Sequence, residues 1–174
     1  MIKRFGDKDT FLKKVNPSTQ SSFASRPDVA VMGDYPTLTD LRNAYGKNFP
    51  AIWLVAQIDN LTLFTGAKNI TEQQHEELAR IIAQEYKFLK VTELLLFFYR
   101  FKTGYYGRFY GAVDPMVITC ALRDFMKERN IFISQHEDER NNREREAQKA
   151  TPTCTHEEYE RYWKQKFEEI HDTD

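Results

Sequence analysis

The segment from Val91 to about Thr103 constrains the fold more than any other, because Leu94-Leu95-Leu96-Phe97-Phe98 makes it apolar on all sides. A leucine-rich run that contains no turn residues and stops at Gly104 favours a helix over a strand. A helix that is apolar all round must be covered on every side. A chain of 174 residues can bury such a core without a disulfide or a metal. We therefore predict a helical domain with this helix at its centre.

Capping residues and apolar periods predict the helices around this centre. Thr71 and Gln74 fit a capping box, in which each side chain satisfies a backbone amide of the other. Asp114-Pro115 places a cap and then a proline at the start of another helix. In chain order, the expected helices run from Thr37 to Gly46, from Ala51 to about Phe64 behind an Asn48 cap, from Thr71 to about Leu89, from Val91 to about Thr103, and from Asp114 to about Ile133. The predicted fold is all-α, an orthogonal bundle of about five helices over residues 37–133.

The two ends of the chain differ from this bundle in pattern. Residues 1–36 hold isolated apolar residues without a helical or alternating period, which predicts an irregular, partly disordered arm. Residues 134–154 have no apolar face and are expected to form a polar helix or a linker. Residues 155–174 follow a second capping box, at Thr155 and Glu158, and predict an acidic amphipathic helix.

This last helix carries a narrow apolar stripe that must be buried on something, either its own domain or a partner. The stripe consists of Tyr159, Trp163, Phe167 and Ile170. The charge around it is negative, since residues 131–174 hold seven basic and twelve acidic groups. The stripe is therefore the candidate partner-binding site.

The N-terminus is charged and is followed by no apolar stretch of signal-peptide length. The longest apolar runs, at Ala51–Ala56 and Leu94–Tyr99, fall far short of the roughly 20 residues that cross a bilayer. We expect a cytoplasmic protein with no membrane partner. Cys120 and Cys154 are expected to be free thiols, with Cys120 on the buried side of its helix.

No catalytic or metal-binding signature is present. The His75-Glu76 and His156-Glu157 pairs have Ala79 and Glu160 where a zinc protease has its second histidine. No serine lies in a Gly-x-Ser-x-Gly turn. Asp114 next to the glycine-rich loop is sufficiently explained as a helix cap. We predict no enzyme activity, no cofactor, no metal and no small-molecule substrate.

The densest feature is the segment 99–111, with six aromatics, three cations and three glycines, and no acidic residue between Glu93 and Asp114. Aromatic rings can stack on bases, and arginine and lysine can neutralise phosphates. On this hypothesis the nucleic-acid-binding residues are Arg100, Lys102 and Arg108 for phosphates and Tyr105, Tyr106 and Phe109 for stacking. The alternative is that the rings pack the loop onto the core while the cations are simply solvated.

Residues 90–130 resemble a family of small, uncharacterised proteins from gut Bacteroidetes and their phages or mobile elements. The shared pattern is an apolar helix, a Lys-x-Gly-x-x-Gly turn, a Tyr-Gly pair, and an aspartate before an apolar helix that ends in arginine. The matching positions are Lys102, Gly104, Gly107, Tyr110, Gly111, Asp114 and Arg129. The resemblance extends loosely back to Thr37, and leaves out the first 36 residues and the acidic tail. It implies no agreed activity or cofactor.

The helical layout is also similar to that of small phage proteins that organise or load a replicative helicase. This second similarity implies DNA contact through residues 100–110 and protein contact through the C-terminal helix. A Walker lysine and serine are missing, which speaks against an ATP-driven loader.

Two functions remain open from the sequence. The first is a non-enzymatic accessory protein of phage or mobile-element DNA replication, which binds single-stranded or duplex DNA, or a replicative helicase or other protein. The second is a protein-binding adaptor that uses the C-terminal stripe and binds no nucleic acid.

Overall fold

The computed structural model describes residues 1–66, 70–150 and 155–171, except for the side chains of residues 150 and 168–171. The regular structure in these ranges is helical, apart from one isolated bridge between Thr37 and Lys90. The expected all-α class is therefore confirmed. The chain divides into two compact units, Met1–Ile133 and Ser134–Asp174, and each is described by itself.

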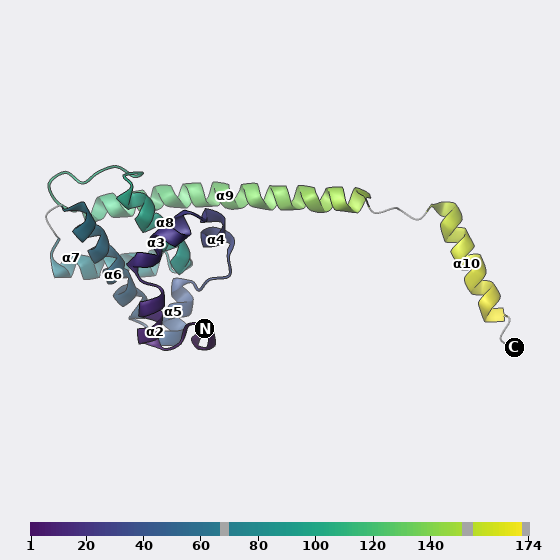
Figure 1. Cartoon of the computed structure of the whole chain (residues 1–174), viewed down its shortest axis with the longest axis horizontal. Coiled ribbons are helices and arrows are strands. Elements are labelled where there is room, and N and C mark those ends of the chain that lie inside the picture. The colour runs from purple at the N-terminus through teal and green to yellow at the C-terminus, as the bar shows by residue number, and fades with distance from the viewer. Residues whose placement is uncertain (67–69, 151–154, 172–174) are drawn as a thin grey trace. The chain divides into compact units, whose positions relative to one another are not determined.

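The centre of the first unit is α8 (Val91–Lys102), as the apolar run predicts. Its residues from Val91 to Phe98 are all buried, and it packs against α3 (Gln20–Ala24), α4 (Pro27–Met32) and α6 (Phe49–Thr65) (Figure 1). Leu94–Phe98 place large apolar side chains all round the helix, so this run has to be covered on every side. The polar Thr92 and Glu93 before it are buried with hydrogen-bond partners.

The other predicted helices are present; three have ends shifted by a few residues, and the last continues well past the predicted Ile133 to Ala150. They are α5 (Leu38–Tyr45), α6, α7 (Glu72–Glu85) and α9 (Pro115–Ala150). Thr71 and Gln74 form the predicted capping box. The backbone N–H of Met116 donates to Asp114 Oδ1 at 2.8 Å, so the predicted cap of α9 is confirmed. Asn48 occupies the N-cap position of α6, but its side chain makes no capping hydrogen bond.

Residues 1–36 are not an irregular arm, and that prediction is wrong. The segment folds into α1 (Ile2–Phe5), α2 (Lys8–Lys14), the 3₁₀ turn η1 (Pro17–Thr19), α3 and α4. It contributes Phe5, Phe11, Val15, Ala30 and Val31 to the same buried core as the later helices. Each helix is too short to show a helical period in sequence and is stabilised by tertiary packing.

The N-terminal segment is tied to the bundle by specific hydrogen bonds. Trp53 Nε1 on α6 donates to the carbonyl of Val15 at 2.6 Å, and Tyr45 donates to the carbonyl of Gly6 at 2.8 Å. The backbone after α4 pairs with the backbone before α8, where Val91 N–H donates to Pro36 at 2.9 Å. Residues 1–36 therefore belong to the same compact unit as the helices that follow them, and the predicted boundary at residue 37 is wrong.

The last part of α9 and α10 (His156–His171) belong to the second unit. Residues 134–149 are helical, which agrees with the polar-helix alternative, and charged pairs four residues apart run along them, such as Arg143 with Glu139 at 3.4 Å. Thr155 and Glu158 form the second predicted capping box. No helix in the described ranges is long and apolar enough to span a membrane.

The prediction for one of the two cysteines needs correction. Cys120 is a free thiol, as expected, but it lies on the exposed side of α9 because Ile118, Ala121, Leu122 and Phe125 form the buried face. Cys154 lies outside the described residues.

Candidate interaction surfaces

The segment 99–111 forms the end of α8 and most of the loop that leads to α9. Gly104, Gly107 and Gly111 have φ angles of 78°, 99° and 82°. Side chains other than glycine rarely adopt this left-handed region. The glycines are therefore required by the turns of the loop.

Two of the three predicted phosphate-binding cations are engaged in contacts that hold the bundle together. Arg100 forms an ion pair with Glu128 of α9 at 3.0 Å, with both side chains about one-third exposed. Lys102 Nζ donates to the side-chain oxygen of Gln20 at 2.7 Å and to that of Asn60. Burial lowers the pKa of Lys102. Arg108 is exposed and makes no hydrogen bond or ion pair with any described residue.

The predicted stacking residues are divided in the same way. Phe109 stacks on Phe101, with ring centroids 5.1 Å apart and planes 22° from parallel. Tyr106 packs on Phe97 at 5.5 Å, and its hydroxyl is buried without a hydrogen bond of standard geometry. Burial raises the pKa of Tyr106 to about 12, although the nearby Arg100 guanidinium offsets part of the rise. Tyr105 is 63% exposed.

The alternative stated for this segment thus describes Tyr106 and Phe109, whose rings pack on the core. It does not describe Arg100 and Lys102, which it expected to be simply solvated and which are held by contacts within the fold. The predicted residues that remain available to a ligand are Tyr105 and Arg108. Tyr110, which the stacking hypothesis did not include, is 93% exposed and joins them. We call Tyr105, Arg108 and Tyr110 the loop face.

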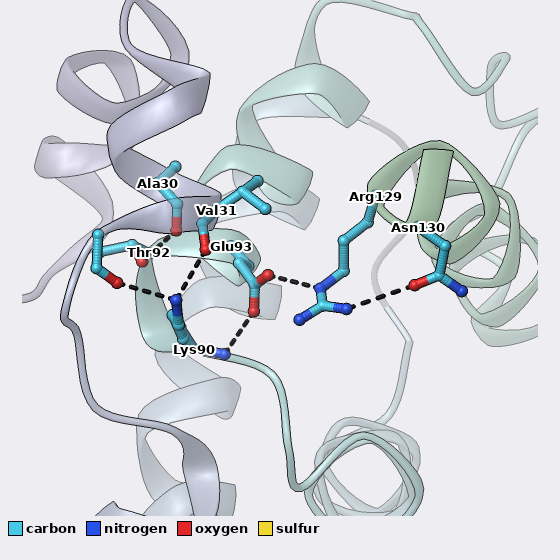
Figure 2. A network of polar contacts seen from close by, with 8 residues as sticks. Ala30, Val31, Lys90, Thr92, Glu93, Arg129 and Asn130 are labelled. Atoms are coloured by element: carbon cyan, nitrogen blue, oxygen red, sulfur yellow. Dashed lines mark hydrogen bonds and ion pairs between the residues drawn. The ribbon is translucent and has the colours of Figure 1, made fainter. Parts of the chain in front are cut away.

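Arg129, which ends the family pattern described above, has a structural role in α9. Its Nε donates to the buried carboxylate of Glu93 on α8 at 2.5 Å. The same carboxylate accepts from the backbone N–H of Lys90 at 2.7 Å, and Lys90 Nζ in turn donates to the carbonyl of Val31 at 2.7 Å (Figure 2). The network joins α4, α8 and α9 at one point.

The stripe on α10 is exposed. Tyr159, Trp163 and Phe167 are 55%, 44% and 60% exposed, and the rings contact one another along the helix. We call these three residues the aromatic stripe. Ile170, the fourth predicted member, has a side chain outside the described part of the chain. No described residue of the second unit is buried, so this unit has no hydrophobic core that could cover the aromatic stripe.

A groove that the sequence did not indicate runs between α5, α6 and α7. One part, of about 690 Å³, has an apolar floor of Ala51, Ile52 and Val55 on α6 and a polar rim on α7. An adjoining part, of about 580 Å³, is lined by four cations and no acidic residue; these are Arg42, Lys47, Arg80 and Lys87. The two parts adjoin at Asn48, Ala51 and Arg80, which line both, and we call them together the α5–α7 groove.

The rim of this groove holds a histidine–carboxylate pair. His75 Nδ1 lies 3.2 Å from Asp59 Oδ1, and His75 Nε2 is buried without a hydrogen-bond partner. Among the described residues, no hydroxyl or thiol side chain lines this part of the groove. In the described part of the chain, no three His, Cys, Asp or Glu residues are placed to hold a metal ion.

Comparison with protein families gives one match. It covers residues 69–171, from just before α7 to the end of α10, and the matching family is DUF6633, a family of unknown function. Unlike the resemblance noted in the sequence, this match includes the C-terminal helix. No curated protein and no solved structure matches the chain.

Proposed function

Because the chain belongs to DUF6633, a family of unknown function, we propose a function from geometry: a non-enzymatic accessory protein that binds a protein partner through the aromatic stripe. One observation carries the proposal. Three aromatic side chains are about half exposed on one face of α10, in a unit with no buried described residue. Amphipathic helices commonly bind other proteins by placing an exposed apolar face in a hydrophobic groove of the partner.

The charge of α10 favours a basic partner surface. The helix holds five acidic and three basic side chains. The helical layout, which resembles that of small phage proteins that organise or load a replicative helicase, makes such a helicase the first partner to test, in the cytoplasm where phages and mobile elements replicate.

The test compares two double variants of the full chain in capture of proteins from extract of the native cell. Trp163→Ser with Phe167→Ser removes the stripe, whereas Arg161→Ser with Lys164→Ser makes the same change on the charged face. We expect the stripe variant to lose the captured partner and the control to retain it. Equal capture by the stripe variant and the unaltered protein would contradict the proposal.

A second candidate function is nucleic-acid binding, favoured by the loop face. Arg108 lies between two exposed tyrosines, in a stretch of 20 residues without an acidic side chain. The hypothesis of a DNA-binding accessory protein of phage or mobile-element replication also includes the predicted orthogonal packing of the helices.

Fluorescence polarisation with labelled single-stranded and duplex DNA, across a salt series, tests this candidate. Arg108→Ala is the informative variant, because changes at Arg100 or Lys102 also break contacts of the fold. We expect weaker binding and a salt slope reduced by about 1. Lys8→Ala, an exposed cation of α2, is the control, and absence of binding at low salt would rule the candidate out.

A further inference from the structure

We infer that the α5–α7 groove is the receptor for α10 of a second copy of this chain, so that the protein self-associates by placing the aromatic stripe in the groove. The inference rests on the proposed function, since it names the partner of the same stripe. The argument has three parts: dimensions, apolar surface and charge.

The dimensions agree. The groove is lined along α7 from Glu72 to Gln84, which at 1.5 Å per residue is about 18 Å of helix. The aromatic stripe from Tyr159 to Phe167 occupies about 12 Å of α10 on the same measure. The whole stripe therefore fits within the groove, with α10 lying along α7.

The apolar surfaces also correspond. Ile52 projects from the floor and is exposed, beside the half-buried Ala51 and Val55. These side chains are small enough to leave room above them for aromatic rings. Large aromatic anchors in a pocket of small aliphatic residues supply most of the energy in many interfaces.

Charge then fixes the direction of the helix. The basic part of the groove carries four cations, of which Arg42, Lys47 and Lys87 make no side-chain ion pair with a described residue. The first half of α10 carries Glu157, Glu158 and Glu160 against one cation, Arg161, whereas in the second half Lys164 and Lys166 are balanced by Glu168 and Glu169. The other part of the groove has Asp59, Glu72 and Glu76 on its rim. The net-acidic N-terminal half of α10 therefore lies over the basic part of the groove.

A second copy is the partner to which the inference commits, because both complementary surfaces belong to this chain and are present in equal numbers. Two copies that exchange their α10 helices form a closed symmetric dimer in which both stripes are covered. A one-sided exchange would leave one groove and one stripe open for further copies.

The test uses charge reversal in the full-length protein, followed by sedimentation velocity over a concentration series. Lys47→Glu with Lys87→Glu should weaken the dimer at least about tenfold, and Glu157→Lys with Glu158→Lys should do the same. Mixing the two variants should restore a dimer, because one acidic groove then meets one basic helix. The control, Lys3→Glu with Lys8→Glu, makes the same charge change outside the groove and should leave the dimer unchanged.

Acrylamide quenching of tryptophan fluorescence gives an independent readout. Trp53 is fully buried, so the quenchable signal reports Trp163 alone. We expect this signal to fall with rising protein concentration and to return in the groove variant.

Other outcomes overturn the inference. A monomer at all concentrations with Trp163 protected would mean that α10 binds its own chain. A dimer that is insensitive to both charge reversals would place the interface elsewhere. A monomer with a quenchable Trp163, whose stripe variant nevertheless loses a captured partner, would leave the proposed function standing while this inference fails.

Discussion

Replacing Arg129 with methionine should destabilise the bundle far more than a surface arginine usually does. Glu93 is fully buried, and its carboxylate has two hydrogen-bond partners, the backbone N–H of Lys90 and the guanidinium of Arg129 (Figure 2). Methionine retains the length of the arginine stem but supplies neither a donor nor a charge. The variant therefore leaves a buried carboxylate without its counter-charge.

The expected magnitude follows from that uncompensated charge. Removing one partner of a buried ion pair typically costs about 3–5 kcal/mol of unfolding free energy, out of about 5–15 kcal/mol for a whole domain. Adding Glu93→Gln to Arg129→Met should recover at least about 1.5 kcal/mol, because the amide is neutral and still accepts from Lys90. The double variant should thus be more stable than the single one.

Urea unfolding followed by circular dichroism measures the loss of unfolding free energy in Arg129→Met and its recovery in the double variant. The comparison requires that the variants share the same slope of unfolding free energy against urea concentration. Arg80→Met is the control, because Arg80 is exposed and its pair with Glu76 at 2.9 Å should contribute less than about 0.5 kcal/mol. The reasoning is refuted if Arg129→Met costs under about 1 kcal/mol, or if Glu93→Gln gives no recovery.

Three further predictions concern the segment 99–111. Lys102→Met should lower the unfolding free energy by about 1–3 kcal/mol, because the buried Gln20 loses its donor; an unchanged urea midpoint would show that this contact contributes nothing. Arg108→Ala should alter stability by less than about 0.5 kcal/mol in the same assay, because the side chain is exposed and makes no ion pair with a described residue, and a larger loss would mean that it packs on the fold. The folded state raises the pKa of Tyr106 from 10.0 to about 12, so it holds the phenolic proton more tightly than the unfolded chain. This contribution to the unfolding free energy is fully present below pH 10 and is lost as the pH rises towards about 12. Because Tyr106 is partly exposed and solvent screens the effect, the contribution amounts to about 1 kcal/mol. Tyr106→Phe should therefore flatten the fall in melting temperature between about pH 10 and about pH 12, and an equally steep fall would contradict the assignment.

The helices with strong local signals could be predicted from the sequence. The capping pairs Thr71–Gln74 and Thr155–Glu158 are formed, and the apolar run of α8 is buried as expected. These features depend on residues within a few positions of one another, and local physical chemistry determines them. Whether the helices cross orthogonally stays a prediction.

Features assembled from distant segments could not be predicted. The α5–α7 groove takes its four cations from four places, with Arg42 on α5, Arg80 on α7 and two lysines in the connections between helices, and no sequence spacing connects them. Similarly, the aromatic and basic pattern of residues 99–111 could not show that Arg100 pairs with Glu128 or that Phe109 stacks on Phe101. The short helices of residues 1–36 were missed because their stability comes from long-range packing.

The helices that surround α8 have a consequence for how this family is dissected. The family match begins at residue 69, yet α8 is covered by α3, α4 and α6, all of which precede it. An expression fragment cut at the family boundary would expose the most apolar helix of the molecule and should aggregate. The segment that folds as a unit therefore includes helices that lie before the segment that the family shares. A relative that retains only the shared part has to shield its equivalent of α8 with other residues or with another protein.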